Sequence, residues 1–564
     1  MRVEGSLQCP YYVAPAVAAM LGTDLEHLHV RAFPMGGAFG GKEDFPSLLG
    51  GHAALLSFLS KKPVRIAFDR AEDIAYTTKR HPSWIRIKAG ARKDGCLCGV
   101  EIEIVFDGGA YATMSPVVLS RGAIHASGAY NWPNAKIEAV AYRTNTPPNG
   151  AFRGFGVPQT IFAIESHMDR LAKACGMEPH SFREKNRLKI GDKTATSQVL
   201  KESVGSEQVL QKALESSNFE EKYRSWGQGK DRVARGIGLG FFWHGAGFTG
   251  SGEAKIAGRV ALDLSSDGLA HIRVSSTEMG QGSHTVLPQI VAEELSVLAG
   301  NVICDPVDTR YVPDSGPTVA SRTTMIVGGE LAVCARNARK HFLEAVGKIF
   351  EKDIDELEIK NGNVLVAGKE FGTFSDLLKQ TLGQLGQERW VFESQHKLAP
   401  NIKWDEATHT GDAYAAYAWG CMVVEVVVDL ELYEISIPKV TVAMDVGRAV
   451  NPIKSRGQIQ GGVVQSLGYA LCEEVGVRSD GAFLRDRFQT YIVPTASDSP
   501  PIDVHLIEVP YSRGPGGAKG LGEMPIHGGA PALANAIEHA LGIRICDLPI
   551  TPEKIFMAMK ERIG

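Results

Sequence analysis

The chain has 564 residues, of which 44% are hydrophobic and 22% charged, and its formal net charge is −4. This length exceeds what one hydrophobic core usually supports, so at least two domains are expected. The weakly negative charge argues against a nucleic-acid partner, and no apolar run is long enough to span a bilayer. We therefore expect a small-molecule substrate, no membrane partner and, since no secretory signal is visible, a cytoplasmic location.

The nine cysteines follow no disulfide pattern, which also favours a reducing compartment. Cys96 and Cys98 form a C-x-C inside an expected hairpin turn, without a second pair at metal-binding spacing. The chain has neither the H-E-x-x-H motif of zinc hydrolases nor the G-x-S-x-G motif of serine hydrolases. No side chain is therefore expected to bind a metal directly.

The first predicted elements are a helix over 14–21, which ends at a glycine, and a strand over 28–33. A glycine-rich loop over 36–43 follows, and then an apolar-faced helix and a strand over 64–68. The loop fits G-x-x-x-x-G-K, but Glu43 stands where a phosphate loop needs a hydroxyl for Mg²⁺. A different ligand loop and a plain connector both remain open.

Alternating residues predict two antiparallel strands within 84–106, and a glycine-rich segment over 107–128 is expected to be irregular. A strand over 137–142 leads into a second glycine-rich loop, 144–156, which opens a helix over 159–174. The charged stretch 215–235 is the best candidate for a boundary between halves. We therefore predict a first domain over 1–225 and a second over 226–564.

The second half repeats the order of strand, glycine-rich loop and helix. The mixture of strands and helices in both halves predicts an α+β (mixed α/β) fold. The predicted elements are strands over 259–264 and 271–275, a loop over 277–282 with a helix to about 298, a loop over 317–321 with a helix over 328–350, strands within 417–446, a loop over 445–452 with a helix over 461–471, and a loop over 514–525 with a helix over 531–541.

Six loops rich in glycine, each with a polar or charged group, are more than connectors require. They predict one site for a large polyanionic cofactor, with one carboxylate reserved for proton transfer. The polar and charged side chains are Glu43, Arg121, Arg153, Gln281, Gln458, Lys519 and Glu523.

Seven segments resemble, in order and spacing, the molybdopterin-binding portion of xanthine oxidase, xanthine dehydrogenase and aldehyde oxidase. The resemblance runs from about Gln8 to the C-terminus and implies two large molybdopterin-binding domains with the cofactor at their interface. Family subunits carry a further N-terminal domain that this chain lacks, so a split gene or a truncated product is expected. The segments are GGAFGGKE (36–43), TNTPPNGAFRGFG (144–156), TEMGQG (277–282), PTVAS (317–321), DVGRAVNP (445–452), GQIQGG (457–462) and AKGLGEMP (518–525).

The resemblance also implies roles for single residues. Glu523 matches the family's general base, and Gln8 matches the glutamine beside the apical oxygen of molybdenum. The pterin dithiolene holds the metal in this family, which fits the lack of a ligand cluster. Residues that match cofactor-binding positions are Ala38, Phe39, Arg153, Met279, Gly280, Gln281, Ala320, Ser321, Thr323 and Gln458.

Three further matches concern the substrate. Glu43 and Arg121 match the polar residues that bind a purine in the xanthine enzymes, and Phe155 matches an aromatic residue that packs on its ring. These residues favour an N-heterocycle with hydrogen-bonding edges. Carbon monoxide dehydrogenase has a cysteine where this chain has Gly154, which argues against that activity.

The resemblance thus implies hydroxylation of an electron-poor carbon in a xanthine-like purine or related N-heterocycle, with water as the oxygen source. The expected cofactor is molybdenum–molybdopterin in its cytosine dinucleotide form. Iron–sulfur (2Fe–2S) clusters and FAD are expected on partner subunits, so a hetero-oligomer is expected. Two alternatives stay open: an aldehyde or other aromatic hydroxylase of the same family, and a non-catalytic truncated remnant.

Overall fold

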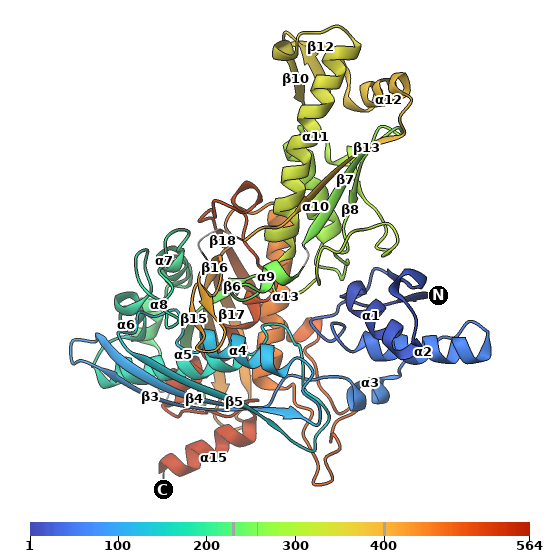
Figure 1. Ribbon diagram of the computed structural model, residues 1–564. Helices are drawn as coiled ribbons and strands as arrows, with labels where there is room; N and C mark the ends of the chain where they lie inside the picture. The colour runs from blue at the N-terminus through green and yellow to red at the C-terminus, as the bar shows by residue number, and fades with distance from the viewer. Residues whose placement is uncertain (228–231, 257, 399–401, 564) are drawn as a thin grey trace. The chain divides into compact units, whose positions relative to one another are not determined.

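The computed structural model describes residues 1–227, 232–256, 258–398 and 402–563, which form two compact units (Figure 1). Each unit is assembled from three stretches of the chain. Strands and helices are mixed in both units, which confirms the predicted α+β class. Unit 1 comprises Met1–Ile66, Ser251–Ile402 and Pro510–Gly520, and unit 2 comprises Ala67–Gly250, Lys403–Val509 and Leu521–Gly564.

The predicted domain boundary at residue 225 falls within unit 2 and coincides with no boundary between the compact units. As the limit between two cofactor-binding domains, it stays a prediction. Within the predicted boundary segment 215–235, residues 228–231 lie outside the described residues. Most of the remaining segment belongs to regular elements: the end of α7 (Ser206–Ser217), α8 (Phe219–Ser225) and the start of β6 (Val233–Ala246).

Unit 2 is built on a four-stranded sheet in the order β18-β17-β16-β6. Strands β6, β16 and β17 are antiparallel neighbours, and β18 pairs parallel to β17. Helix α14 packs on β6, where a Cβ at Gly236 or Gly238 would lie 2.1 or 2.2 Å from backbone atoms of Ala536, and one at Gly240 would lie 2.7 Å from the carbonyl oxygen of Gly528, just before the helix. These alternate glycines let the helix backbone lie directly on the strand. The bounds are β16 (Ala416–Asp429), β17 (Ile435–Asp445), β18 (Ile502–Ile507) and α14 (Gly529–Leu541).

A second sheet of unit 2 has the order β3-β4-β5, with helices α4 and α5 packed beside it. Its three strands and α5 confirm the predicted elements, whereas the expected irregular segment 107–128 contains a helix, α4. The bounds are β3 (Ser83–Ala91), β4 (Leu97–Gly109), α4 (Ser115–His125), β5 (Ala135–Arg143) and α5 (Val157–Ala174); the remaining elements are α3 (Arg70–Tyr76), α6 (Pro179–Asn186), β14 (Trp404–Asp405), β15 (Thr410–Gly411), α13 (Pro452–Leu471) and α15 (Pro552–Ile563).

Unit 1 has a four-stranded sheet in the order β13-β7-β8-β9. Helix α11 packs on this sheet and runs on to the small sheet β10-β11-β12 (Figure 1). The bounds are α9 (Gly252–Lys255), β7 (Arg259–Ser265), β8 (Ala270–Arg273), α10 (Ser283–Leu295), β9 (Val302–Cys304), α11 (Gly328–Ile349), β10 (Leu357–Lys360), β11 (Asn363–Val366), β12 (Lys369–Thr373), α12 (Phe374–Leu385) and β13 (Arg389–Gln395).

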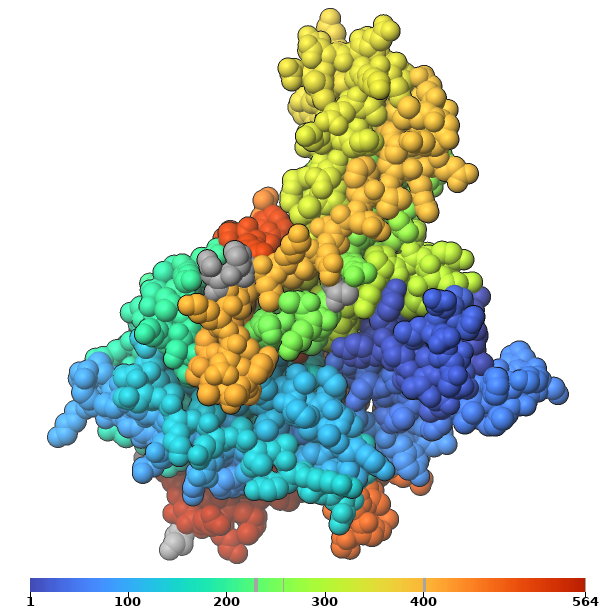
Figure 2. Space-filling view, viewed as in Figure 1, coloured from blue at the N-terminus to red at the C-terminus, as the bar shows by residue number. Residues whose placement is uncertain are grey.

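The N-terminal part of unit 1 pairs β1 (Arg2–Gly5) with β2 (His29–Ala32) and packs α1 (Pro10–Leu21) on α2 (Pro46–Ser60). Helix α1 ends at Gly22 in the left-handed conformation, as predicted. Helix α2 lies at the surface (Figure 2) and exposes Leu48, Leu56, Phe58 and Leu59.

The strand predicted over 64–68 is wrong, because residues 63–69 form no regular element. Their side chains alternate between half-buried and exposed, yet no described strand pairs with them. Among the described residues, no helix combines the length and the apolar character that crossing a bilayer requires. All nine cysteines are free thiols.

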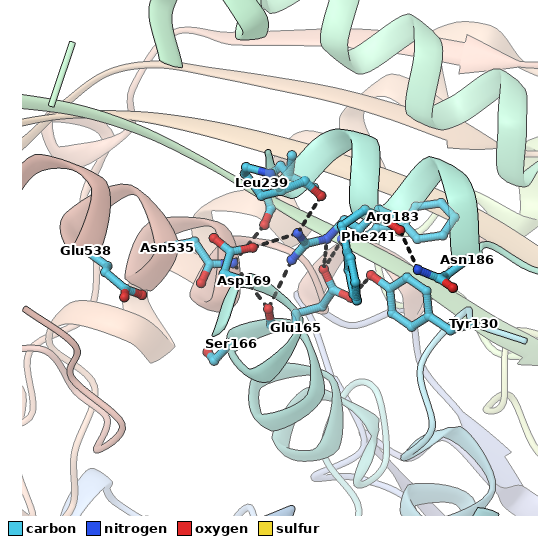
Figure 3. A network of polar contacts seen from close by, with 12 residues as sticks. Tyr130, Glu165, Ser166, Asp169, Arg183, Asn186, Leu239, Phe241, Asn535 and Glu538 are labelled. Atoms are coloured by element: carbon cyan, nitrogen blue, oxygen red, sulfur yellow. Dashed lines mark hydrogen bonds and ion pairs between the residues drawn. The ribbon is translucent and has the colours of Figure 1, made fainter. Parts of the chain in front are cut away.

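A buried ion pair joins two helices inside unit 2 (Figure 3). Arg183 of α6 and Glu165 of α5 have fully buried side chains, and Arg183 Nε donates to Glu165 Oε2 at 2.9 Å. Arg183 also donates to Asp169 Oδ1 at 2.6 Å. The Glu165 carboxylate further accepts from the hydroxyl of Tyr130 and from the backbone N–H of Phe241 on β6. The pair therefore ties both helices to the central sheet.

Candidate functional site

Glu523 of unit 2 lies in the short turn that precedes α14. Its Oε2 atom is 3.5 Å from Arg121 Nη1 and 3.2 Å from His244 Nε2. The side chains of Arg121 and His244 are 4% and 2% exposed, and that of Glu523 is 12% exposed. Two of the sequence-predicted residues thus lie together, because the buried guanidinium of Arg121 and the buried ring of His244 both adjoin the partly exposed carboxylate of Glu523.

Helix α4 and the end of β6 fix the position of Arg121. Its guanidinium donates to the carbonyl oxygens of Gly245, at 3.4 Å, and Gly247. The guanidinium carbon lies 5.1 Å from the ring centre of Tyr414. A guanidinium offers only donors in a planar fork, so this arrangement holds a fixed hydrogen-bonding edge beside the carboxylate.

Three buried histidines adjoin the pair, and the sequence analysis missed all of them. His125 Nε2 accepts from the N–H of Gly245 at 3.0 Å, so its Nδ1–H donates to the carbonyl of Arg121 at 2.8 Å. His527 Nε2 lies 2.9 Å from His244 Nδ1. Burial lowers the pKa of each histidine below its ordinary value, although Glu523 opposes the shift at His244. Burial therefore favours the neutral form of all three rings.

Spacing is the signal that could have found two of these histidines. His125 follows Arg121 by four residues on α4, which places both side chains on one face of that helix, and His527 lies four residues after Glu523, at the other end of the same short turn. His244 has no such local signal, because β6 and the loop before α14 bring it to Glu523 across 279 residues.

Arg153 connects the loop before α5 to helix α13 and to the loop of Glu523. Its Nε donates to the carbonyl of Gly522 at 2.7 Å, and its Nη2 donates to the carbonyl of Gln458 at 3.2 Å. Burial lowers the pKa of Arg153 to about 10, although Glu523 opposes this shift. Arg80 donates to the carbonyl of Arg153 at 2.8 Å, and burial lowers its pKa to about 10 as well.

A buried guanidinium such as that of Arg153 is costly unless an anion compensates it, so this corner of unit 2, with half-buried Arg80 beside it, suits an anionic ligand. Beside it, Gly457 and Gly461 lie one turn apart on α13, and an added Cβ at either position would meet no atom within 4 Å. A ligand can therefore approach the helix backbone closely there. These features fit a pterin with a phosphate group.

Phe155 lies in the loop before α5, and its backbone is in the left-handed region, with φ +54°. Its half-buried ring packs on the core of unit 2. Left-handed non-glycine residues are strained and often mark functional sites. Phe39, Ala320 and Ser321 of unit 1, with φ between 52° and 55°, share this conformation. Four predicted site residues therefore have strained backbones.

Gly154 leaves no room for a side chain. Its φ is +91°, and an added Cβ would lie 2.6 Å from Pro158 Cγ and 2.9 Å from His527 Cε1. We expect Gly154→Ala to lower the free energy of unfolding by about 2–4 kcal/mol, because backbone strain and overpacking add. Urea titration followed by tryptophan fluorescence measures it, since six of the seven tryptophans lie in unit 2.

Gly176→Ala is the matched control. Gly176 has φ +67° but no atom within 4 Å of an added Cβ, so only backbone strain of about 1 kcal/mol is expected. Equal losses in the two variants would show that His527 and Pro158 do not confine residue 154.

In unit 1, Gln8 fixes the first glycine-rich loop. Its Oε1 accepts from the N–H groups of Gly40, at 3.1 Å, and Lys42, at 3.3 Å, and its Nε2 donates to the carbonyl of Thr318 at 3.1 Å. The side chain is 3% exposed. The side-chain amide of Gln8 therefore joins the loop 36–43 to the loop 317–321. The loop 36–43 is also joined to the loop 277–282, because the N–H of Gly37 donates to the carbonyl of Met279 at 2.9 Å.

The loop 277–282 is held by a residue that the sequence analysis did not select, Glu278. Its carboxylate accepts from the N–H groups of Gly280, Gly282 and His284 at 2.8–2.9 Å. Burial would raise the pKa of Glu278, but these bonds outweigh it and hold the pKa below its usual value. The Gln281 side chain bridges Met279 N–H, at 2.6 Å, and the carbonyl of Thr277, at 2.8 Å.

The remaining predicted residues of unit 1 occupy the same group of loops. Ala320, Ser321 and Thr323 surround Arg322, whose buried guanidinium pairs with Glu253 at 2.9 Å. In the loop 36–43, Phe39 is 53% exposed and Glu43 is buried, at 2%. Glu43 belongs to unit 1 and Arg121 to unit 2, so their joint contact with one substrate stays a prediction.

Comparison with known proteins shows the family of the chain. Residues 1–187 and 212–500 each match a family described as a molybdopterin cofactor-binding domain. A probable xanthine dehydrogenase subunit of Bacillus subtilis (strain 168) is 33% identical over 544 residues, which cover 95% of this chain and 70% of that protein. The aldehyde oxidoreductase of Megalodesulfovibrio gigas is 27% identical over 98% of this chain and 56% of that protein.

Among solved structures, quinoline 2-oxidoreductase from Pseudomonas putida 86 matches with a TM-score of 0.87 and 25% identity, over 99% of this chain and 72% of that one. The resemblance described for the sequence is thereby confirmed. The chain belongs to the xanthine dehydrogenase and aldehyde oxidoreductase family, as a molybdopterin-binding, molybdenum-dependent oxidoreductase subunit.

Proposed function

We propose that the chain hydroxylates an electron-poor carbon of a xanthine-like purine or related N-heterocycle, with water as the oxygen source. The observation that carries this proposal is the buried Arg121 guanidinium, 3.5 Å from the Glu523 carboxylate. Ring nitrogens and carbonyl oxygens of a heterocycle accept hydrogen bonds from such a group. Relatives named as xanthine dehydrogenase and quinoline 2-oxidoreductase support this substrate class.

In this proposal Glu523 is the general base and accepts a proton at its carboxylate. The positive charge of the Arg121 guanidinium beside it favours its ionised form before the reaction. Burial excludes bulk water, which would otherwise compete for the proton. Phe155 packs against the substrate ring, and Glu43 binds its polar edge.

A bound molybdopterin cofactor would supply the redox-active molybdenum that the two-electron oxidation of the substrate needs. Arg153 and the open face of α13 near Gln458 would bind its anionic part, and Gln8 would lie near the metal. In unit 1 the proposed contacts are Ala38, Phe39, Met279, Gly280, Gln281, Ala320, Ser321 and Thr323.

We also propose the cytosine dinucleotide form of the cofactor, and partner subunits that carry 2Fe–2S clusters and FAD. Electrons must leave the site after each turnover, and the described residues hold no cluster of histidine, cysteine and carboxylate side chains for a metal relay. A cytoplasmic hetero-oligomer is therefore proposed, in keeping with nine free cysteines.

The test is turnover of the chain purified together with its partner subunits. Hypoxanthine, xanthine, nicotinate, quinoline and benzaldehyde are assayed at matched molybdenum content. Preference for the heterocycles supports the proposal, whereas preference for benzaldehyde favours the aldehyde hydroxylase alternative. If the complex contains no molybdenum under conditions in which a control enzyme is loaded, both the heterocycle and the aldehyde hydroxylase proposals are contradicted.

Arg121→Met tests the substrate class within a single variant. We expect kcat/KM for the best heterocycle to fall by about 100-fold, because a buried hydrogen bond to a charged group is lost, and to fall much less for benzaldehyde. The ratio of the two values is measured, since general damage to the site cancels in it. An unchanged ratio would mean that Arg121 does not bind the heterocycle.

A further inference from the structure

His244 lies between the proposed base and a second histidine. Its Nε2 is 3.2 Å from Glu523 Oε2, and its Nδ1 is 2.9 Å from His527 Nε2. The side chain of His244 is 2% exposed and His527 is 1% exposed. We propose that His244, oriented by His527, is a positioning residue that holds the Glu523 carboxylate through its Nε2–H group. This inference rests on the proposed role of Glu523 as the base.

The hydrogen bonds of the two rings allow two arrangements of their protons. In the first, His527 Nε2–H donates to His244 Nδ1, and His244 Nε2–H then donates to Glu523. In the second, His244 Nδ1–H donates to His527 Nε2, so the bare Nε2 of His244 faces the carboxylate. Only the first arrangement lets His244 donate to the ionised carboxylate.

A separate observation on His527 favours the same arrangement. Its Nδ1 is buried and contacts no hydrogen-bond partner among the described residues. The second arrangement would place a proton on this atom and bury an unpaired N–H group, which is unfavourable. The first keeps the atom as a bare acceptor, so no unpaired N–H group is buried.

Arg121 does not displace this bond. Its Nη1 lies 3.1 Å from His244 Nε2, but its guanidinium already has the carbonyls of Gly245 and Gly247 as acceptors. Charged or titratable groups that act on the site come from several elements. They are Arg121 and His125 of α4, His244 of β6, Tyr414, Arg80, Arg153 and, on the turn of Glu523 itself, His527.

The first experiment needs no turnover. The full chain is labelled with ¹⁵N-histidine, and ring resonances are assigned with His244→Gln and His527→Asn. We expect His244 to be neutral, with the proton on Nε2, between pH 6 and 8. A proton on Nδ1, or a doubly protonated ring, would overturn the inference whatever the enzyme's substrate is.

The second experiment uses the loaded complex. We expect His244→Phe to lower kcat by about 10- to 100-fold at unchanged KM and molybdenum content, because the carboxylate loses its orientation. The acidic limb of the kcat/KM profile should move to higher pH, since a donor to the ionised carboxylate is lost. His244→Gln, whose amide can donate to the carboxylate, should restore most of kcat.

His539→Gln is the matched control, because His539 also contacts β6, at the N–H of Ile237, away from Glu523. It should leave kcat and the pH profile unchanged. If His244→Phe has the same kcat and pH profile as the wild-type enzyme, the positioning role of His244 is overturned while the proposed function stands. A loaded wild-type complex inactive on every substrate would contradict the proposed function, and the ring tautomer would still be measured.

Discussion

Glu523→Gln is expected to lower turnover by about 10³-fold or more while the protein keeps its molybdenum and pterin. Glutamine keeps the shape of the side chain and can still contact Arg121 and His244, but it cannot accept a proton from the reacting group. The loss should therefore appear in kcat rather than in cofactor content. Steady-state rates and molybdenum analysis of the same preparations measure the two effects separately.

Glu425→Gln is the control for this variant. Glu425 is a buried carboxylate of the same unit, paired with Lys222 at 2.6 Å. Its replacement should leave turnover per molybdenum unchanged. Near-normal turnover of Glu523→Gln would remove Glu523 from the role of base, and parallel loss of molybdenum would make it a cofactor-retention residue instead.

Arg183→Met is expected to cost about 3–5 kcal/mol of folding free energy, because it leaves the Glu165 carboxylate buried without its charge partner. The hydroxyl of Tyr130 and the N–H of Phe241 remain as donors to Glu165, but neither carries a charge. Urea unfolding of unit 2, followed by tryptophan fluorescence, measures the loss.

Two comparisons make the expectation about Arg183 specific. Arg86→Met breaks an ion pair with Glu103 whose side chains are 64% and 42% exposed, and it should cost less than about 1 kcal/mol. The double variant Glu165→Gln with Arg183→Met should recover part of the loss, because no charge is left buried. Equal costs for Arg183→Met and Arg86→Met would contradict the role of the buried pair.

Local signals predicted much of the fold. The end of α1 at Gly22 and the glycine-rich loops before α5 and α10 follow from the conformations that glycine allows. Helix α4 was missed because its residues lie in a glycine-rich stretch, and its buried face becomes visible only when α5 and β5 pack beside it. The predicted strand 64–68 has strand-like alternation but no described neighbour to pair with.

Some residues of the candidate site could likewise be predicted from local sequence, whereas others could not. Arg121, Arg153 and Glu523 could be selected because charged residues in glycine-rich loops are unusual. His244 could not, since a lone histidine in an apolar strand is typical of a core residue. Only the pairing of β6 with β16, and the packing of α14 on β6, bring it to the carboxylate. Long-range register of this kind has no signature in a single sequence.

The carboxylate of Glu278 occupies the amides at the start of α10, which would otherwise attract a phosphate. The first turn of that helix is consequently already neutralised, so it attracts an anionic ligand less than a helix start with free amides would. The same bonds keep the loop in shape before any ligand arrives, and cofactor insertion is spared the entropy of ordering it.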